Sequence, residues 1–281
     1  LGSGSWIHRP APVPVSGLGA VASLSVGWWS GCTLDAAGVP RCWGSLPDQG
    51  HDGYRRVDHL SPVDMSGLPA LEALSSGGGH YCALDGDGQV WCWGDNGQGE
   101  LGDGTTRNMR DPARVEGLED ALDVSAGYEH SCAVRADGKV LCWGDNEHGQ
   151  LGYGEIGNAY DRATPTEVLG LEGATMVRVR DHHSCAVTGA GEAWCWGLNT
   201  SGELGDGRNQ TTGIPVRVRL LEGVVEMGLG DVFTCALRDG GLLFCWGSNG
   251  DHRNGIGRHT NEPLLVTLES GEALTGVVDI G

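Results

Sequence analysis

Ten cysteines occur as five pairs, and the two residues of each pair lie ten positions apart. The pairs are Cys32 and Cys42, Cys82 and Cys92, Cys132 and Cys142, Cys185 and Cys195, and Cys235 and Cys245. Zinc sites favour spacings of about two to four residues between cysteines, which these pairs do not match. Free buried thiols would leave the paired spacing unexplained. We therefore predict a disulfide within each pair and no metal bound to these cysteines.

Acid–base and aromatic residues recur at two positions of the same repeat, four and three residues before the first cysteine of a pair. The five copies hold Trp28 and Trp29, Gly78 and Gly79, Tyr128 and Glu129, Asp181 and His182, and Asp231 and Val232. Carboxylates near a histidine can serve as general acid and base, and glycoside hydrolysis needs two carboxylates. Exposed aromatic side chains suit recognition of a partner. The candidate catalytic residues are Glu129, Asp181, His182 and Asp231, and the candidate binding residues are these four with Trp28, Trp29 and Tyr128.

Three histidines and three acidic turns could bind metal ions. His80, His130 and His183 share one repeat position, but the other copies have Ser30 and Phe233 there, which favours a structural role. Gly-Asp-Gly occurs at 86–88, 102–104 and 205–207 without the full spacing of a calcium loop. We expect no cofactor, and calcium in these turns is the alternative.

Short strands must position all these residues. In the third copy we expect strands at 121–126, 131–134, 140–143 and 165–168, called a, b, c and d, with turn residues between them and no helical period. A four-stranded unit repeated every 40–50 residues is typical of a β-propeller blade. If Cys132 faces Cys142, the b–c hairpin has a three-residue loop ending at Gly138, the left-handed position that favours glycine. This register places the cysteines directly opposite one another.

The repeated motifs resemble the RCC1 repeat. They include His-Ser-Cys-Ala at 130–133 and 183–186, and Gly-[Glu/Gln]-Leu-Gly at 99–102, 149–152 and 202–205. Cys-Trp-Gly-x-Asn ends at Asn96, Asn146, Asn199 and Asn249. The resemblance covers nearly the whole chain and implies an all-β propeller, seven-bladed in the best-known members, with little said about activity. The paired cysteines depart from most of the family. A secreted inhibitor of β-lactamases has a similar repeat, which is consistent with a protein partner.

We expect one propeller domain over residues 1–281, with five complete blades and a partial sixth. The repeats lie near 17–66, 67–116, 117–169, 170–219, 220–269 and, for the partial copy, 270–281. A lone d strand is expected at 12–15 and a lone a strand at 277–280. The chain begins at Leu1 without a methionine or signal peptide and stops at Gly281, so we expect a processed chain or a piece of a longer protein.

Strand alternation places the a–b and c–d loops on one face of the propeller. Because a strands line the axis of a propeller, the a–b corners should converge on one opening, here called the mouth. The c–d loops at 48–56 and 250–254 also differ between copies, and variable loops on a constant framework are where function usually lies. The tryptophans after the second cysteines point away from the disulfides and should form the core between blades: Trp43, Trp93, Trp143, Trp196 and Trp246.

The composition excludes several functions. A net charge of -19 argues against binding of nucleic acid or an anionic membrane, and no apolar run is long enough to span a bilayer. Disulfides indicate an oxidising location: secreted, periplasmic or on the cell surface. We favour a binding module for a protein or glycan, acting through the a–b and c–d loop face. One alternative is an extracellular carbohydrate-active enzyme, a hydrolase or lyase, with the carboxylates at the mouth. The other is a structural propeller within a larger extracellular protein, in which Trp28 and Trp29 pack against the N-terminal strand.

Overall fold

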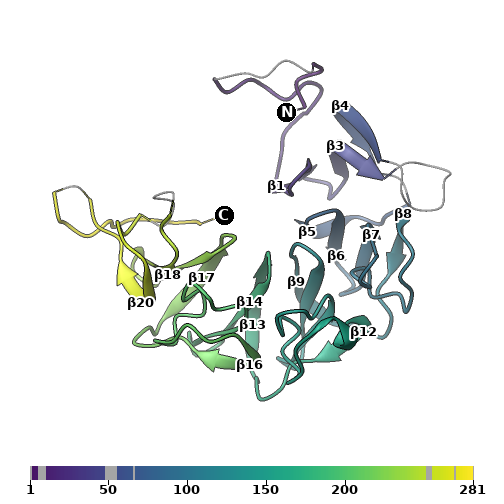
Figure 1. The fold of residues 1–281 in the computed structure, drawn as a ribbon. Helices are drawn as coiled ribbons and strands as arrows, with labels where there is room; N and C mark the ends of the chain where they lie inside the picture. The colour runs from purple at the N-terminus through teal and green to yellow at the C-terminus, as the bar shows by residue number, and fades with distance from the viewer. Residues whose placement is uncertain are drawn as a thin grey trace.

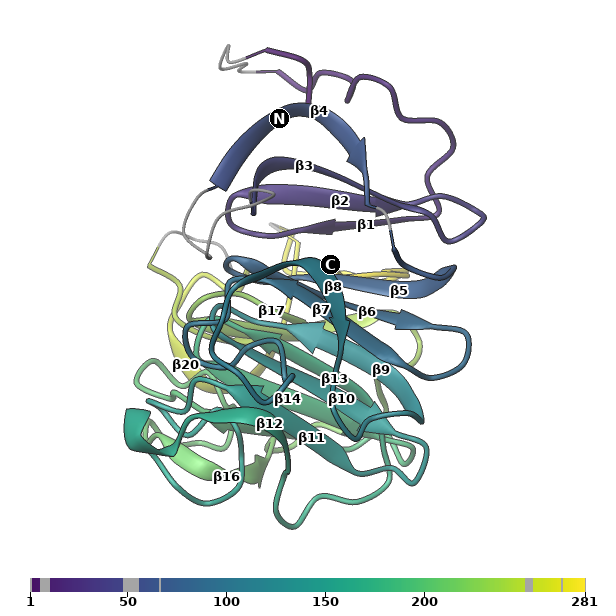
Figure 2. The same cartoon turned by 90° about the vertical axis from the view of Figure 1, so that its right-hand side faces the viewer.

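The computed structural model describes residues 2–5, 11–47, 56–65, 67–250, 255–268 and 270–280. These residues form five four-stranded antiparallel sheets, each built from four consecutive strands in chain order. Figures 1 and 2 show the sheets as blades that follow one another along an arc. The predicted all-β fold with five four-stranded blades is confirmed.

The blades have the following bounds. The first contains β1 (Ser23–Val26), β2 (Ser30–Leu34), β3 (Pro40–Pro47) and β4 (Arg56–Asp64), and the second β5 (Leu71–Ser76), β6 (His80–Asp85), β7 (Val90–Gly94) and β8 (Met109–Arg114). The third contains β9 (Ala121–Ala126), β10 (His130–Arg135), β11 (Val140–Gly144) and β12 (Arg162–Glu167), preceded by the 3-10 turn η1 (Asn158–Tyr160). The fourth contains β13 (Ala174–Arg180), β14 (His183–Thr188), β15 (Ala193–Gly197) and β16 (Thr212–Arg217). The fifth contains β17 (Val224–Leu229), β18 (Phe233–Arg238), β19 (Leu242–Gly247) and β20 (Thr260–Leu265).

The first strand of each blade lies along the inner side of the arc and contacts the first strand of the next blade (Figure 1). Hydrogen bonds between a backbone amide and a serine hydroxyl link adjacent inner strands. The amide of Ala126 donates to Ser75 Oγ, and the amide of Val179 donates to Ser125 Oγ. The a–b corners of adjacent blades are therefore held in a fixed order around the axis. Among the described residues, none forms a helix long and apolar enough to cross a bilayer.

The hairpin register agrees with the prediction. Cys132 pairs with Cys142 in the ladder, and the amide of Arg135 donates to the carbonyl of Lys139 across a loop whose Gly138 has a φ of +78°. All five predicted disulfides form, with Cα–Cα distances of 4.1–4.2 Å, and no cysteine is free. Nine of the ten cysteines are buried and Cys235 is partly buried, so the disulfides fix the middle of each blade.

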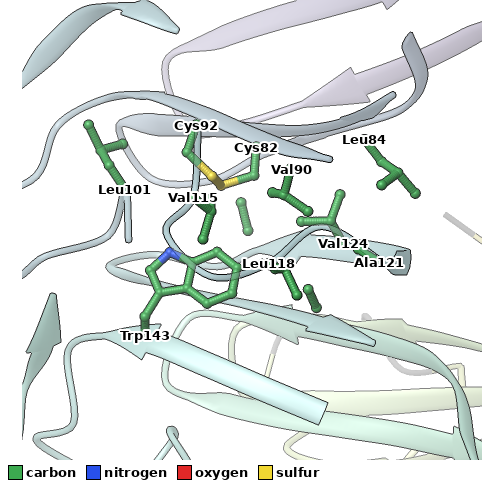
Figure 3. Close-up of a cluster of buried hydrophobic side chains, with 12 residues drawn as sticks. Cys82, Leu84, Val90, Cys92, Leu101, Val115, Leu118, Ala121, Val124 and Trp143 are labelled. Carbon is green, nitrogen blue, oxygen red and sulfur yellow. A yellow bond between two sulfur atoms is a disulfide. The ribbon is translucent and has the colours of Figure 1, made fainter. Parts of the chain in front are cut away.

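The repeated tryptophans fill the seams, meaning the packed surfaces between adjacent blades. Trp143 is fully buried among Cys82, Val115 and other residues of the second blade (Figure 3). Its indole N–H donates to the carbonyl of Glu100 at 2.7 Å, and Trp196 and Trp246 make the same bond to Gln150 and Glu203. The predicted core role of these residues is confirmed.

The expected lone strands at 12–15 and 277–280 do not form regular strands. A strand needs a ladder partner, and neither segment has one among the described residues. Both segments still dock as the repeat predicts. A Cβ on Gly2 would lie 2.7 Å from Val15 and 2.9 Å from Trp43, as one on Gly102 would lie 3.0 Å from Val115 and 2.9 Å from Trp143. At the other end, the amide of Ile280 donates to Glu226 on the inner strand of the fifth blade.

Candidate functional site

The a–b corners and the starts of the c–d loops meet on one face. The amide of Asp145, which follows a Cys-Trp-Gly motif, donates to the carbonyl of Glu129 at the a–b corner. Asp95 makes the same bond to Gly79, and Leu198 to His182. Residues at these two places in the repeat therefore lie beside one another at the mouth. The variable c–d residues at 48–55 and 251–254 lie outside the described residues.

An aromatic row crosses the mouth. The rings of Trp28 and Tyr128 have centroids 5.0 Å apart, and the Tyr128 ring lies 5.9 Å from the imidazole of His182, edge to face. His182 in turn contacts the ring of His148 at 4.8 Å. Trp28 comes from the first blade, Tyr128 from the third and His182 from the fourth. The structure thus brings together three of the predicted binding residues.

The glycines of the second blade make this row possible. A Cβ at Gly78 would lie 2.4 Å from the Tyr128 carbonyl oxygen and 2.8 Å from its ring, so the corner has no room for a side chain. Trp28 therefore reaches Tyr128 across the second blade. Trp28 is 45% exposed and Trp29 is 64% exposed, which does not support packing of both indoles against the N-terminal segment.

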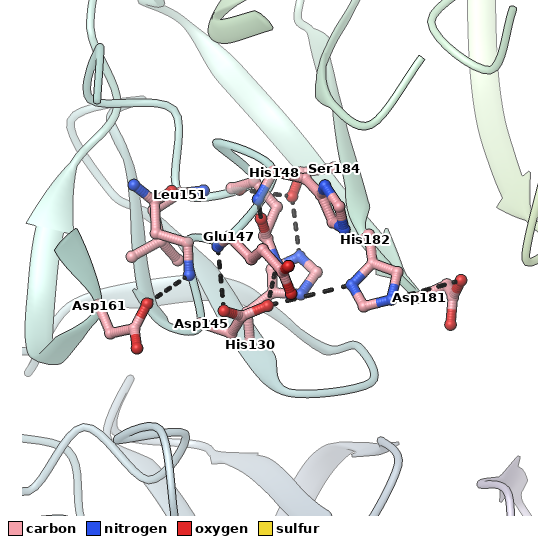
Figure 4. A network of polar contacts seen from close by, with 11 residues as sticks. His130, Asp145, Glu147, His148, Leu151, Asp161, Asp181, His182 and Ser184 are labelled. Atoms are coloured by element: carbon pink, nitrogen blue, oxygen red, sulfur yellow. Dashed lines mark hydrogen bonds and ion pairs between the residues drawn. The ribbon is translucent and has the colours of Figure 1, made fainter. Parts of the chain in front are cut away.

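Carboxylates flank His182 on both sides (Figure 4). Its Nδ1 lies 4.0 Å from Asp145 Oδ2, and its Nε2 lies 3.9 Å from Asp181 Oδ2. Asp181 has a φ of +39°, a left-handed conformation that costs about 1 kcal/mol or more for a residue other than glycine. Burial raises the pKa of the Asp181 carboxyl. Burial and the Asp145 charge raise the pKa of Glu129.

Asp231 adjoins this group through an arginine. Its Oδ1 lies 3.8 Å from Arg180 Nε, at the end of the inner strand that leads to Asp181. The predicted acidic residues therefore come from neighbouring corners of the third, fourth and fifth blades. Glu129 and Asp181, with raised pKa values beside a histidine, have properties suited to acid–base chemistry.

A hollow of about 410 Å³ opens at the seam between the second and third blades. Its lining includes Arg56, Asp95, Glu100 and Glu129. Arg56 Nη1 pairs with Asp95 at 3.1 Å, and its Nη2 donates to the Gly79 carbonyl. Glu100 is only 3% exposed, and burial, with a smaller effect of the Glu129 charge, raises its pKa to about 7.

Sequence reasoning missed Asp95, Glu100, Asp145 and His148 because they lie in or beside repeated motifs that were assigned to the framework. One signal was present. The residue before Leu-Gly alternates between glutamate and glutamine, as Glu100, Gln150 and Glu203. Because both a charged and a neutral side chain occur at this position, the fold alone does not determine which residue is found there.

The three repeated histidines are buried inside the seams. The Nε2 atoms of His80, His130 and His183 are 2.8–2.9 Å from hydroxyl groups of the next blade, on Ser131, Ser184 and Thr234. Each hydroxyl donates to a backbone carbonyl, so the histidine must donate to it. Burial lowers the pKa of His80 and His183 to about 3, which keeps these rings neutral. This geometry supports the structural interpretation of the histidines.

The acidic turns are closed by their own hydrogen bonds. Asp103 accepts from the amide and hydroxyl of Thr105 and from Asn96, and Asp206 accepts from the Arg208 amide and from Asn199. Within the described ranges, no group of three His, Cys, Asp or Glu side chains is arranged to hold a metal ion. Calcium binding by the turns stays an untested alternative.

Sequence profiles of the regulator of chromosome condensation (RCC1) repeat match most of the central chain. One matches residues 87–134, 137–187 and 190–237, and a second matches 72–100, 122–150 and 224–253. The chain belongs to the RCC1 repeat family. No curated protein sequence matches it.

Several solved structures are similar in fold to this chain, among them yeast RCC1, which is Prp20. Prp20p from Saccharomyces cerevisiae has a TM-score of 0.79 at 20% identity, over 89% of this chain and 64% of Prp20p. Human WBSCR16 has a TM-score of 0.72 at 19% identity, over 87% of this chain and 66% of the other. The ectodomain of the Physcomitrella patens receptor kinase CR4 has a TM-score of 0.51 at 23% identity, over 81% and 51%. The chain therefore spans about two thirds of the first two structures, and the likeness establishes the fold.

Within this RCC1 framework, the repeated and unrepeated residues have separate positions. The repeated tryptophans and histidines, and all the cysteines except the partly buried Cys235, are buried in the blades and seams. The aromatic and acidic residues of the mouth differ from copy to copy. In this RCC1 repeat protein, the mouth therefore contains residues that differ from one copy of the repeat to the next.

Proposed function

We propose that this protein is a binding module that recognises a protein partner through the mouth. The observation that carries the proposal is the aromatic row, in which the half-exposed Trp28 contacts Tyr128 and Tyr128 contacts His182. Large aromatic side chains with partly exposed faces are the commonest anchors of protein interfaces. They are also unrepeated, so the fold does not require them.

The framework supports such a role because it holds the corners in place. The amide of Gly78 donates to the carbonyl of Gly127 in the next blade, and disulfides clamp every hairpin below the corners. A rigid site loses little conformational entropy on binding. The yeast propeller Prp20p, which has the same fold, binds Gsp1p and histones.

We further propose that the protein works in an oxidising compartment, secreted, periplasmic or at a cell surface. The five disulfides support this, because such bonds persist where thiols are not kept reduced. Protein isolated without reductant should gain no mass on alkylation under denaturing conditions. Alkylation at ten cysteines would contradict the proposal.

Substitution of the two exposed tryptophans tests the binding site. Partners should be captured on immobilised parent protein, identified by mass spectrometry and measured again with the purified partner. We expect Trp28→Ala to weaken binding by about 30-fold or more, as for a hot-spot residue. Leu220→Gly is the matched control, since Leu220 is 87% exposed in a d–a loop on the opposite face. Equal affinity of parent and Trp28→Ala/Trp29→Ala for that partner would refute the site.

A carbohydrate-active enzyme is the second candidate, favoured by the raised pKa values of Glu129 and Asp181. A general acid needs such a shift to remain protonated near neutral pH. The test is release of reducing ends from a panel of polysaccharides, with Glu129→Gln and Asp181→Asn as controls. Release that depends on either carboxylate would support an enzyme, and no release would leave binding as the function. A glycan array tests whether the same mouth binds sugars without cleaving them.

A further inference from the structure

The hollow between the second and third blades contains two carboxylates, those of Glu100 and Glu129, that are not paired with a cation. In the described part of the chain, no lysine, arginine or histidine nitrogen lies within 4.0 Å of a carboxylate oxygen of Glu100 or Glu129. Asp95, in the same hollow, is already paired with Arg56. The hollow therefore has one compensated and two uncompensated negative charges.

Glu100 is the more unusual of the two. It is 97% removed from solvent, yet it lines the hollow, and its carboxylate accepts from backbone amides alone, those of Gln98 and of Glu100 itself. Desolvation of a carboxylate without a counter-ion is costly, and Glu129 adds repulsion. Burial is the largest cause of the raised pKa of both groups; the Glu129 charge adds to it at Glu100, and the Asp145 charge adds to it at Glu129. A cation that entered the hollow would relieve both costs.

The repeat shows that the fold does not need this arrangement. The position of Glu100 is occupied by Gln150 in the third blade, and the corner position of Glu129 is occupied by His182 in the fourth. At that next seam, Gln150 Nε2 donates to Asp145, so the equivalent site is internally satisfied. The paired carboxylates at Glu100 and Glu129 are specific to one seam.

We propose that the hollow takes a lysine or arginine side chain of the protein partner, with its cation between Glu100 and Glu129. This inference rests on the proposed function, because it names the chemistry by which the partner is recognised at the mouth. The volume of about 410 Å³ is enough for one long side chain, and Tyr128 of the aromatic row directly precedes Glu129, which lines the hollow. Charge complementarity favours a basic occupant over an acidic or neutral one.

The test uses defined peptides, so that it does not depend on finding the partner. Acetyl-Gly-Gly-Lys-Gly-Gly-amide and its arginine and norleucine counterparts are titrated into the parent protein, and the carboxyl carbon resonances of Glu100 and Glu129 are followed by NMR. The basic peptides should bind and lower the pKa of Glu100, whereas the norleucine peptide should not. Affinity should rise as the pH increases through about 7, because Glu100 then ionises.

Variants give the specific outcomes. Glu100→Gln and Glu129→Gln should each lower the affinity for the lysine peptide by about tenfold, which is the effect of losing one charge-assisted contact. The glutamine should fold normally, since Gln150 occupies the equivalent place. Glu203→Gln is the matched control, because Val232 occupies the corner position that Glu129 has beside Glu100.

Any one of three results would overturn the inference. The lysine peptide could leave the Glu100 resonance unshifted, the norleucine peptide could bind as tightly as the lysine peptide, or Glu100→Gln could bind the lysine peptide as tightly as the parent does. Any of them would leave the proposed function intact if Trp28→Ala still loses the partner. If instead Trp28→Ala still binds the partner while the peptides behave as expected, the site for a basic side chain would be supported. The proposal that the aromatic row binds the partner would then be refuted.

Discussion

Replacing Glu100 with glutamine should stabilise the protein at alkaline pH and not at acidic pH. Glu100 is buried at a seam, and Gln150 shows that the amide fits the same place in the next blade. The hydrogen bond is conserved as well, because Gln150 Oε1 accepts from the His148 amide just as Glu100 Oε2 accepts from the Gln98 amide. The substitution therefore removes a charge and leaves the shape and the backbone contact unchanged.

The expected magnitude follows from the pKa of Glu100, which burial raises from 4.5 to about 7. The folded state binds a proton that the unfolded chain releases between these values, so stability falls as the pH rises from 4.5 to 7. Each pKa unit corresponds to about 1.4 kcal/mol, and the cost of ionised Glu100 above pH 7 is at most about 3 kcal/mol. Glu100→Gln should recover much of this at pH 8 and gain almost nothing at pH 4.5.

Urea denaturation followed by tryptophan fluorescence measures the effect at a series of pH values. The difference in unfolding free energy between Glu100→Gln and the parent should grow through the window from 4.5 to 7 and then level off. Gln150→Glu is the reciprocal control, and it should destabilise the protein at high pH because it places a carboxylate beside Asp145. A gain that is the same at pH 4.5 and pH 8 would refute the titration argument, and no gain at pH 8 would refute the burial cost.

Three further predictions follow from other parts of the structure. Burial lowers the pKa of His183 from 6.5 to about 3, so the folded state should lose stability as the pH falls through this range. His183→Phe, chosen because Phe233 occupies the same repeat position, should lose less unfolding free energy over this range when urea denaturation is repeated at several acidic pH values. Parallel plots of unfolding free energy against pH for the variant and the parent would contradict this. Joint replacement of Cys132 and Cys142 by alanine should lower the free energy of unfolding, measured by urea denaturation, by about 3 kcal/mol, because the loop entropy of one hairpin disulfide is lost. A change near zero would show that the ladder alone holds the hairpin. Leu220 has a φ of +56° where the other d–a turns have glycine, so Leu220→Gly should stabilise the protein by up to about 1 kcal/mol, and a lower melting temperature would show that its side chain makes a stabilising contact.

The hairpins are the part of the fold that the sequence predicted in detail. The positions of Cys132, Gly138 and Cys142 were enough to predict the register, the loop and the disulfide, because all three features depend on residues within one short segment. The core role of Trp143 followed from strand alternation in the same segment. Features that involve contacts far along the chain were predicted less well. The last strand of the third blade was expected at 165–168 and begins at Arg162, and the segments at 12–15 and 277–280 dock without becoming regular strands.

The mouth was predicted as a set of corners, but its contacts were not. The sequence placed Trp28, Tyr128 and His182 at equivalent positions of different copies, yet gave no distance between them. Whether they touch depends on the rotation between blades and on the missing side chains of Gly78 and Gly79.

The sequence by itself determined the blades, their disulfides and which residues vary between copies, since a repeat of fixed period encodes local structure that each unit forms in the same way. Only the tertiary structure decided which of the varying residues meet, and how strongly each is desolvated. Glu100 shows the difference most clearly. Within its motif it is interchangeable with glutamine, and only its burial beside Glu129 gives it a raised pKa and a place in a hollow that could accept a cation. Burial and electrostatic coupling depend on neighbours from other blades, which no single repeat contains.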